Sequence, residues 1–207
     1  MCARFTQHSS PARISERFNI SRIIKFPVTG DFIVPSQDAA IVYTLENGQR
    51  VLDVSKFGLV TQWMQSKPGF KPLINARAET IDTRPAFRDS FINKRCLIPA
   101  TGFFEWKEVN KAKLPYYFTV KGTDLFSFAG IWEASDSSNR SGFSTFAIIT
   151  VPANELVSQV HPRMPVVLTP ETENLWLGND AKVTELKGLL RAYSAEQMIM
   201  TLAKQKQ

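Results

Sequence analysis

Apolar residues gather in short runs of strand length through the middle of this chain, and turn residues separate the runs. Strands are predicted over residues 40–45 and 50–60, 95–107 and 115–121, 125–132 and 143–151, and 163–169. Asn47-Gly48 lies between the first two runs and is a strong hairpin signal, so these two strands are expected to pair. The polar stretch 135–142 is expected to join the third pair.

Helical segments are short and few. Helices are predicted over 11–18, 154–160 and 170–177, with one or two more within 182–206. Ser9-Ser10 and Thr169 are expected to supply the caps of the first and third of these, with Pro11 and Pro170 in the first turns. Because strands dominate the middle and no regular crossover helices separate them, the predicted fold class is α+β. The sheet is expected to be mostly antiparallel, and curved or barrel-like.

Length and composition favour one globular domain over residues 1–207, since 207 residues with 43% hydrophobic content can bury a sizeable core. No apolar run reaches the length of a membrane span, and the N-terminus lacks the pattern of a signal peptide, so an intracellular protein is expected. Two cysteines make neither a disulfide framework nor a zinc site. Cys96 lies in an apolar run and is predicted to be a buried strand residue.

The net charge is +6 and the pI is about 9.4, and two segments carry an excess of basic residues. Residues 1–25 carry five Lys or Arg against one acidic residue, and residues 84–95 carry four against one. Such clusters can bind phosphates, and they are equally typical of a solvated basic face. Charge alone leaves both interpretations open.

Cys2 directly follows the initiator methionine, so removal of Met1 would expose a thiol and a primary amine two carbons apart. With ordinary pKa values, useful fractions of amine and thiolate are present near neutral pH. The amine can form a Schiff base with an aldehyde, and the thiol can then close a five-membered thiazolidine ring. The position of Cys2 alone favours an ordinary small residue over a nucleophile. The motifs described next favour the nucleophile.

Three further segments carry polar groups suited to chemistry. Asn75, Arg77 and Glu79 would share one face of an extended segment and suit an anionic ligand, although a polar strand edge is the commoner case. Glu105 lies within Gly102-Phe103-Phe104-Glu105-Trp106, where neighbouring rings favour a raised pKa; a Glu–Lys surface ladder is the alternative.

His161 lies between a helix-like segment and an apolar strand, where a loop could present its imidazole for proton transfer. Arg163, two residues on, could face the same way and hold a phosphate. A lone histidine is more often structural, and His8 is interpreted as a surface residue. Cys2, Asn75, Glu105 and His161 also fit a cysteine hydrolase, which sequence spacing neither supports nor excludes.

Taken together these segments resemble the SRAP family, the SOS-response-associated peptidases or abasic-site-processing proteins. The resemblance covers roughly residues 1–178, with 179–207 as divergent C-terminal helices. The matching blocks are 1–5, 57–60, Trp63, 74–80, 95–100, 102–106, 115–118, 128–132, 146–150 and 161–168.

The resemblance implies a reaction and the residues that perform it. Cys2 would be the nucleophile, joined through its amine and sulfur to the ring-opened sugar aldehyde of an abasic site. Glu105 would be the general acid and base, and His161 would assist proton transfer and sugar handling. Asn75 would hold the terminal residue and the sugar.

The resemblance also implies DNA contacts. Arg4, Arg77 and Arg163 would bind flanking phosphates, and the Trp63 ring would support a base or the bent strand. The implied partner is single-stranded DNA containing abasic sites, with no cofactor, metal or membrane. A monomer in the cytoplasm, associated with the nucleoid when bound to DNA, is expected.

The implied function is an abasic-site sensor whose covalent thiazolidine crosslink shields the lesion during the DNA damage or SOS response. This is lyase-like Schiff-base chemistry, and it requires removal of Met1. The alternative is a cysteine peptidase or amidase, with autoproteolytic N-terminal processing, that uses Cys2 and His161. A third hypothesis is a module that binds single-stranded nucleic acid without chemistry.

The chain departs from the family pattern at four positions near these motifs. Ala3 stands for a usual Gly, Phe32 for a common Asn, Thr61 for a usual Pro and Thr101 for a usual Asp. The family's C-terminal segment is not recognisable in residues 185–207. The departures concern the shape of the pocket, and they leave Cys2 and the three polar candidates unchanged.

Overall fold

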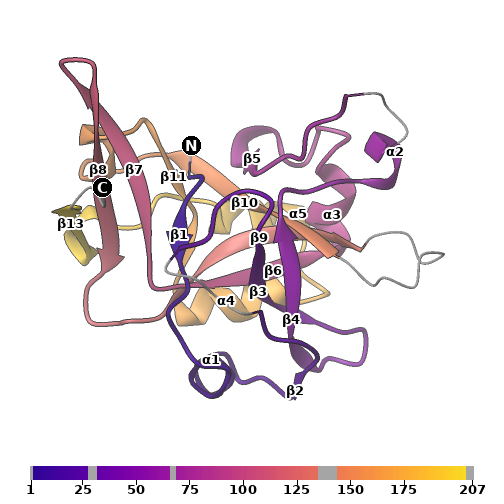
Figure 1. Cartoon of the computed structure of the whole chain (residues 1–207). Helices are drawn as coiled ribbons and strands as arrows, with labels where there is room; N and C mark the ends of the chain where they lie inside the picture. The colour runs from indigo at the N-terminus through magenta and orange to yellow at the C-terminus, as the bar shows by residue number, and fades with distance from the viewer. Residues whose placement is uncertain (1, 28–31, 66–68, 135–143, 204–207) are drawn as a thin grey trace.

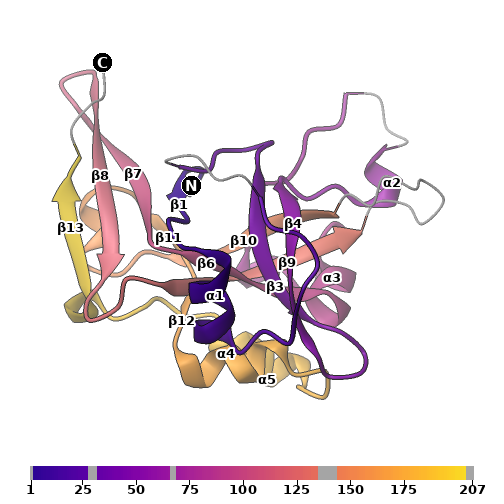
Figure 2. The same ribbon diagram turned by 60° about the horizontal axis from the view of Figure 1, so that its bottom comes forward.

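Two β-sheets frame the molecule, and the N-terminal segment lies between them (Figures 1 and 2). The structure is a computed structural model that describes residues 2–27, 32–65, 69–134 and 144–203. Within these ranges the larger sheet has nine strands: β2 (Arg22–Ile23), β3 (Asp38–Thr44), β4 (Arg50–Phe57), β5 (Asn75–Arg77), β6 (Arg95–Ala100), β9 (Phe126–Ala134), β10 (Ser144–Pro152), β11 (Arg163–Pro165) and β12 (Val167–Leu168).

The larger sheet closes on itself. Strand β10 pairs with β4 on one side and with β9 on the other, so β10, β4, β3, β6 and β9 form a closed ring. The β3–β4 pair is the hairpin predicted across Asn47-Gly48, and the β9–β10 pair is the predicted third pair. Apart from the parallel pairs β10–β4, β10–β5 and β2–β4, the pairing is antiparallel. The predicted α+β class with a barrel-like sheet is confirmed.

The smaller sheet has the order β1-β7-β8-β13, formed by β1 (Phe5–Thr6), β7 (Gly102–Val109), β8 (Ala112–Val120) and β13 (Met198–Leu202). Strand β6 belongs to the barrel and β7 to the smaller sheet, with only Thr101 between them. The single strand predicted over 95–107 is therefore two strands in different sheets. The apolar run continues through Thr101, so the sequence pattern contains no break at the point where the chain changes partners.

The helices are short and lie around the outside of the two sheets (Figures 1 and 2). They are α1 (Pro11–Phe18), α2 (Gln62–Gln65), α3 (Arg88–Asn93), α4 (Pro170–Leu177) and α5 (Val183–Leu189), with 3-10 turns η1 (Ala78–Thr80), η2 (Val157–Gln159) and η3 (Ala195–Gln197). The predicted caps are confirmed, because the Ser10 and Thr169 side chains accept from backbone N–H groups of the first turns of α1 and α4. Among the described residues, no helix is long and apolar enough for a membrane span.

Two helix predictions near the C-terminus are wrong in part. Residues 154–160 form only the single turn η2, where the Asn154 side chain accepts from Val157 N–H and donates to the Tyr193 carbonyl. The segment 182–206, expected to be helical, contains α5 and then β13, which pairs with β8. Met198 is buried and Met200 half-buried, whereas Ile199 and Thr201 are exposed. This two-residue period fits a strand, and β8 offers a free edge for it.

The N-terminal segment is fixed by a ring and an amide. The Phe5 ring contacts Phe57 of β4 and Phe128 of β9 edge-on, with centroids 5.7 and 5.9 Å apart. The Gln7 amide is buried; its Nε2 donates to the carbonyls of Ala40 and Pro99, and its Oε1 accepts from Ala40 N–H. Strands β3 and β6 are paired only at Val42 and Leu97, so Gln7 supplies backbone-like bonds between them.

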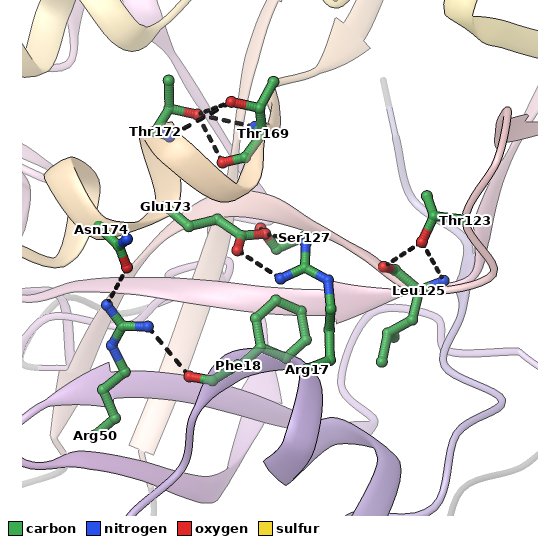
Figure 3. A network of polar contacts seen from close by, with 10 residues as sticks. All are labelled: Arg17, Phe18, Arg50, Thr123, Leu125, Ser127, Thr169, Thr172, Glu173 and Asn174. Atoms are coloured by element: carbon green, nitrogen blue, oxygen red, sulfur yellow. Dashed lines mark hydrogen bonds and ion pairs between the residues drawn. The ribbon is translucent and has the colours of Figure 1, made fainter.

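A buried ion pair attaches α1 to α4 (Figure 3). The Glu173 carboxylate on α4 accepts from Arg17 Nη1 and Nη2 at 2.9 and 3.0 Å, and from Ser127 Oγ at 2.8 Å. Nearby, Arg50 of β4 donates to the Phe18 carbonyl and to Asn174 Oδ1. The bonds from Arg17 and Ser127 satisfy the buried Glu173 carboxylate, which would be costly to bury alone.

The basic cluster over 84–95 is partly structural. Arg95 is 7% exposed, and its guanidinium donates to main-chain carbonyls at the C-terminal ends of two helices: Phe91 and Ile92 on α3, and Trp176 and Gly178 at the end of α4. Lys94 pairs with Glu133. A cation at helix C-termini is favoured by the unpaired carbonyls there. Two of the four basic residues are thus engaged within the protein.

Gly102, opposite Thr6 of β1, has no space for a side chain. A Cβ at this position would lie 2.2 Å from Tyr117 Cζ and Oη, and Tyr117 Oη lies 2.7 Å from Thr6 Oγ1. We expect Gly102→Ala to destabilise the protein by about 1–3 kcal/mol, because the Tyr117 ring must move. The midpoint of urea unfolding measures this loss.

Gly188→Ala is the matched control. Gly188 lies in α5 with open space around its Cα, so alanine should stabilise the helix by up to about 1 kcal/mol. Equal unfolding midpoints for Gly102→Ala and the unchanged protein would contradict the packing argument.

Candidate active site

Four polar candidates from distant parts of the sequence meet where the N-terminal segment runs between the sheets. Asn75 Nδ2 donates to the Cys2 carbonyl at 3.1 Å, and His161 Nδ1 lies 4.0 Å from Glu105 Oε1. The Glu105 carboxylate is also close enough to Cys2 to raise the pKa of its thiol. The structure therefore brings Cys2, Asn75, Glu105 and His161 into one cluster.

Strand pairing brings Cys2 alongside Glu105. In the β1–β7 pair Phe5 lies opposite Phe103, and Phe104 N–H donates to the Arg4 carbonyl at 2.9 Å. Continuing this antiparallel register by two residues sets Ala3 opposite Glu105, with Cys2 next along the chain. Cys2 is fully buried, with 0% exposure.

The Cys2 thiol is held in its neutral form. Burial raises its pKa well above the usual range, and the Glu105 carboxylate raises it further. The expectation of a useful thiolate fraction near neutral pH is therefore wrong for the folded protein. The physical reason is desolvation, which disfavours the charged form of any buried group.

Asn75 connects β5 to the N-terminal segment. Its strand pairs in parallel with β10, with Asn75 opposite Ile148. The Nδ2 group donates to the Cys2 and Ile74 carbonyls at 3.1 and 3.0 Å. The Oδ1 atom is buried and has no hydrogen-bond partner within the described residues, so it can accept a hydrogen bond from a bound hydroxyl.

Glu105 is an acid poised near neutrality. Its side chain lies on β7 and is almost fully buried, and burial raises its pKa to about 7. Side chains alternate along β7: Phe103 and Glu105 are buried, whereas Phe104 and Trp106 are half-buried and contact each other. A carboxyl with this pKa can both donate and accept a proton at physiological pH.

His161 is presented by the loop between η2 and β11, as predicted. Arg163 N–H donates to His161 Nδ1 at 3.0 Å, and the Arg163 carbonyl lies at the same distance from this nitrogen. Burial lowers the pKa of His161, which favours the neutral ring. Neutral Nδ1 accepts from Arg163 N–H, so the proton is assigned to Nε2; a protonated Nδ1 could instead donate to the carbonyl.

The Arg163 side chain is engaged within the protein. Its Nη atoms form a bidentate pair with the Glu79 carboxylate, and Nη2 also donates to the Thr150 carbonyl at 2.6 Å. The prediction that Glu79 shares a strand face with Asn75 is wrong, because β5 ends at Arg77 and η1 follows. This turn lets Glu79 reach Arg163.

The side chains of the other expected DNA contacts are at least partly exposed. Arg77 and Trp63 are exposed, and Arg4 is half-buried. The Arg4 guanidinium lies over the Phe32 ring at 4.6 Å and the Trp106 ring at 4.9 Å. Sequence reasoning did not single out Phe32 for this contact. The feature of the sequence that could have indicated it is the apolar Phe32 in place of a common Asn of the family pattern.

Two of the remaining departures are accommodated by local packing. Thr101 Oγ1 donates to Thr6 Oγ1 at 2.7 Å and accepts from His8 N–H, so it helps to hold the N-terminal segment. Ala3 is half-buried. Nothing in the structure explains the replacement at Thr61, which is buried. Within the described ranges no group of three or more metal-ligating side chains could hold an ion.

Comparisons with known proteins identify relatives of this chain. The family model described as SOS response associated peptidase (SRAP) matches residues 1–206. The chain is 37% identical over 206 residues to the abasic site processing protein YoqW of Bacillus subtilis, covering 96% of this chain and 90% of that protein. It is 30% identical over 186 residues to the abasic site processing protein YedK of Escherichia coli, covering 86% and 79%. A crystal structure of a Bacteroides thetaiotaomicron protein superposes with a TM-score of 0.85 at 26% identity, covering 99% and 93%.

The raised pKa of Glu105 makes stability depend on pH. Its folded pKa of about 7 exceeds its ordinary value of 4.5, so the folded state binds the proton more tightly. This stabilisation is fully present below pH 4.5 and is lost as pH rises through 7. Glu105→Gln cannot titrate, so its free energy of unfolding should not fall in this way. Between pH 5 and pH 8 we expect that free energy to rise by up to about 3 kcal/mol relative to that of the unchanged protein.

Urea-unfolding free energies of both proteins at the two pH values measure the effect. Glu79→Gln is a control of opposite sign, because the hydrogen bond from Arg163 lowers the pKa of Glu79 and its contribution is lost as pH falls. A constant difference between Glu105→Gln and the unchanged protein from pH 5 to pH 8 would refute the assignment.

Proposed function

Because the chain belongs to the SRAP family, we propose that it processes abasic sites in single-stranded DNA by joining them covalently to Cys2. The observation that carries the proposal is the buried Cys2 main chain, held by Asn75 beside Glu105. A cysteine in an ordinary core position has no need of an amide and two proton-transfer groups around it. The same cluster would serve as a site for a sugar aldehyde.

The proposed reaction begins with removal of Met1, which lies outside the described residues. Removal leaves Cys2 with a primary amine next to its thiol. An abasic sugar exchanges between a closed hemiacetal and an open aldehyde, and the protonated Glu105 carboxyl can donate to the ring oxygen as the ring opens. The Asn75 Oδ1 atom can accept from a sugar hydroxyl and hold it in position.

The amine then attacks the aldehyde carbon. A C–N bond forms, the oxygen gains a proton, and loss of one water molecule leaves an imine. Glu105 and His161, 4.0 Å apart, can supply and receive the protons of these steps. Burial raises the pKa of Glu105 to about 7, so this carboxyl can give or take a proton at physiological pH, and it lowers the pKa of His161, which favours a neutral ring that can accept one.

The thiol closes the ring. A C–S bond forms at the imine carbon, the thiol proton is transferred to the nitrogen, and the product is a thiazolidine; the overall reaction releases one water molecule. The raised pKa of the thiol suits this order, because a neutral thiol does not compete with the amine for the aldehyde. Proximity of the two groups supplies a high effective molarity for closure.

DNA would follow the surface around the cluster. Arg77 and Trp63 are exposed and suit a phosphate and a stacked base, and Arg4 has guanidinium nitrogens beyond its ring contacts. Arg163 could bind a phosphate only by exchanging it for Glu79. The crosslink would shield the lesion during the response to DNA damage.

The alternatives account for fewer features. A cysteine peptidase needs a thiolate, whereas burial and Glu105 keep the Cys2 thiol neutral, and His161 Nδ1 is bound to Arg163 N–H. A binding module without chemistry needs neither a buried terminal cysteine nor a carboxyl of raised pKa. The covalent reaction uses all four groups of the cluster.

A gel experiment tests the proposed reaction. We expect a heat-stable shifted band when the protein is mixed with a single-stranded oligonucleotide that carries one abasic site, and no band with Cys2→Ala. Cys2→Ser keeps the amine, so borohydride should trap its imine although no stable ring forms. Intact mass on the same sample establishes whether Met1 is absent.

The matched control is the same oligonucleotide with an intact base, which offers no aldehyde. If protein with a free Cys2 terminus gives no band on abasic DNA, the proposed function is wrong.

A further inference from the structure

Phe32 and Arg4 form a composite surface beside the proposed site. The Arg4 guanidinium lies between two rings, 4.6 Å from the Phe32 centroid and 4.9 Å from the Trp106 centroid. Phe32 remains 37% exposed, although an apolar ring of this size gains free energy from burial. One part of the ring is therefore covered by a cation while another part is open to solvent.

This pair is rigidly attached to the N-terminal segment. Phe5 and Ile33 exchange two main-chain hydrogen bonds, of 3.1 and 2.7 Å, one residue beyond Arg4 and Phe32 respectively. Both Phe5 and Ile33 are fully or nearly fully buried. The position of the Phe32 main chain relative to the N-terminal segment is thus set by backbone bonds and core packing.

Arg4 is available to an anion. Within the described part of the chain its guanidinium has no carboxylate or hydrogen-bond acceptor, and its buried Nε has no partner. The two rings hold its orientation at low entropic loss, in contrast to Arg163, which Glu79 neutralises. A phosphate that approaches Arg4 therefore arrives next to an open aromatic ring.

An open ring beside a phosphate-binding cation fits one part of a nucleotide strand. An abasic site deprives its neighbouring base of a stacking partner on one side, so one face of that base is exposed. We propose that the open part of Phe32 stacks on this neighbouring base while Arg4 binds the adjoining phosphate. The inference rests on the proposed function, and it identifies Phe32 as a specificity-determining residue.

Stacking predicts a preference for certain bases next to the lesion, whereas phosphate binding alone predicts none. A purine overlaps a phenyl ring more than a pyrimidine does, so a purine next to the lesion should bind more tightly. The preference should therefore be a property of this chain that follows from Phe32.

The alternative is that Phe32 only supports Arg4, and salt dependence separates the two. Loss of a phosphate contact lowers the slope of log affinity against log salt by about 0.7 for single strands, whereas loss of stacking leaves the slope unchanged. Stacking on one aromatic side chain contributes about 1–3 kcal/mol, or roughly 5- to 100-fold in affinity. Both quantities are within reach of a titration.

The experiment uses a single-stranded oligonucleotide with one tetrahydrofuran abasic analogue, which has no aldehyde and cannot crosslink. Fluorescence anisotropy gives the affinity at several salt concentrations, with dA or dT beside the lesion. We expect Phe32→Leu and Phe32→Ala to bind about 5- to 100-fold more weakly with an unchanged salt slope, and to lose the preference for dA. Phe32→Trp should retain both affinity and preference.

Two variants serve as controls. Arg4→Ala should reduce the salt slope by about 0.7 and keep the preference for dA. Ile199→Ala removes an exposed apolar side chain from β13, at the opposite edge of the small sheet from β1, and should change nothing. Leucine keeps an apolar side chain but has no ring, and unchanged urea-unfolding midpoints of Phe32→Leu and Phe32→Ala would show that their binding defect does not reflect misfolding.

Several outcomes would overturn the inference. Unchanged affinity in Phe32→Leu means that no base stacks on this ring, and a reduced salt slope means that Phe32 only supports Arg4. The covalent reaction is read separately, by mixing the unchanged protein with aldehyde-bearing DNA. Failure of the crosslink in the unchanged protein with a free Cys2 terminus would remove the proposed function, whereas a normal crosslink with no Phe32 effect would remove only this inference.

Discussion

The buried N-terminal segment is the constraint on which the site depends. Chain termini usually lie at the surface and are poorly ordered unless something ties them down. Here Phe5 packs on rings of two barrel strands, and the Gln7 amide bonds to β3 and β6 where those strands have almost no backbone pairing of their own. Without these anchors the register that sets Ala3 opposite Glu105 would not persist, and Asn75 would have no fixed carbonyl to hold.

Desolvation acts on three titratable groups of the cluster in one direction, towards neutrality. It raises the pKa of the Cys2 thiol and of Glu105, and it lowers the pKa of His161. A site that disfavours charge on these groups suits a condensation, in which neutral amine and aldehyde combine and water leaves. It suits thiolate hydrolysis poorly. The strong charges lie nearby, on Arg4 and on the Arg163–Glu79 pair.

Local signals in the sequence predicted the elements that local physics determines. The α1 and α4 caps, the Asn47-Gly48 hairpin and the α+β barrel follow from capping residues, turn residues and apolar runs. The resemblance supplied the four clustered residues, although neither spacing nor charge could show that they meet. The split at Thr101, the strand β13, and the Arg163–Glu79 pair were not predictable, because each depends on a partner distant in sequence.

The full burial of Cys2 has a consequence for the order of events during synthesis. An aminopeptidase needs an extended, accessible chain end, and the folded protein does not expose its second residue. The strands that enclose this residue, β5 and β7, emerge from the ribosome roughly 75–110 residues later, which at about 5–20 residues per second takes several seconds or more. Maturation of the proposed nucleophile therefore competes with folding, and the rate of translation sets the time available to it.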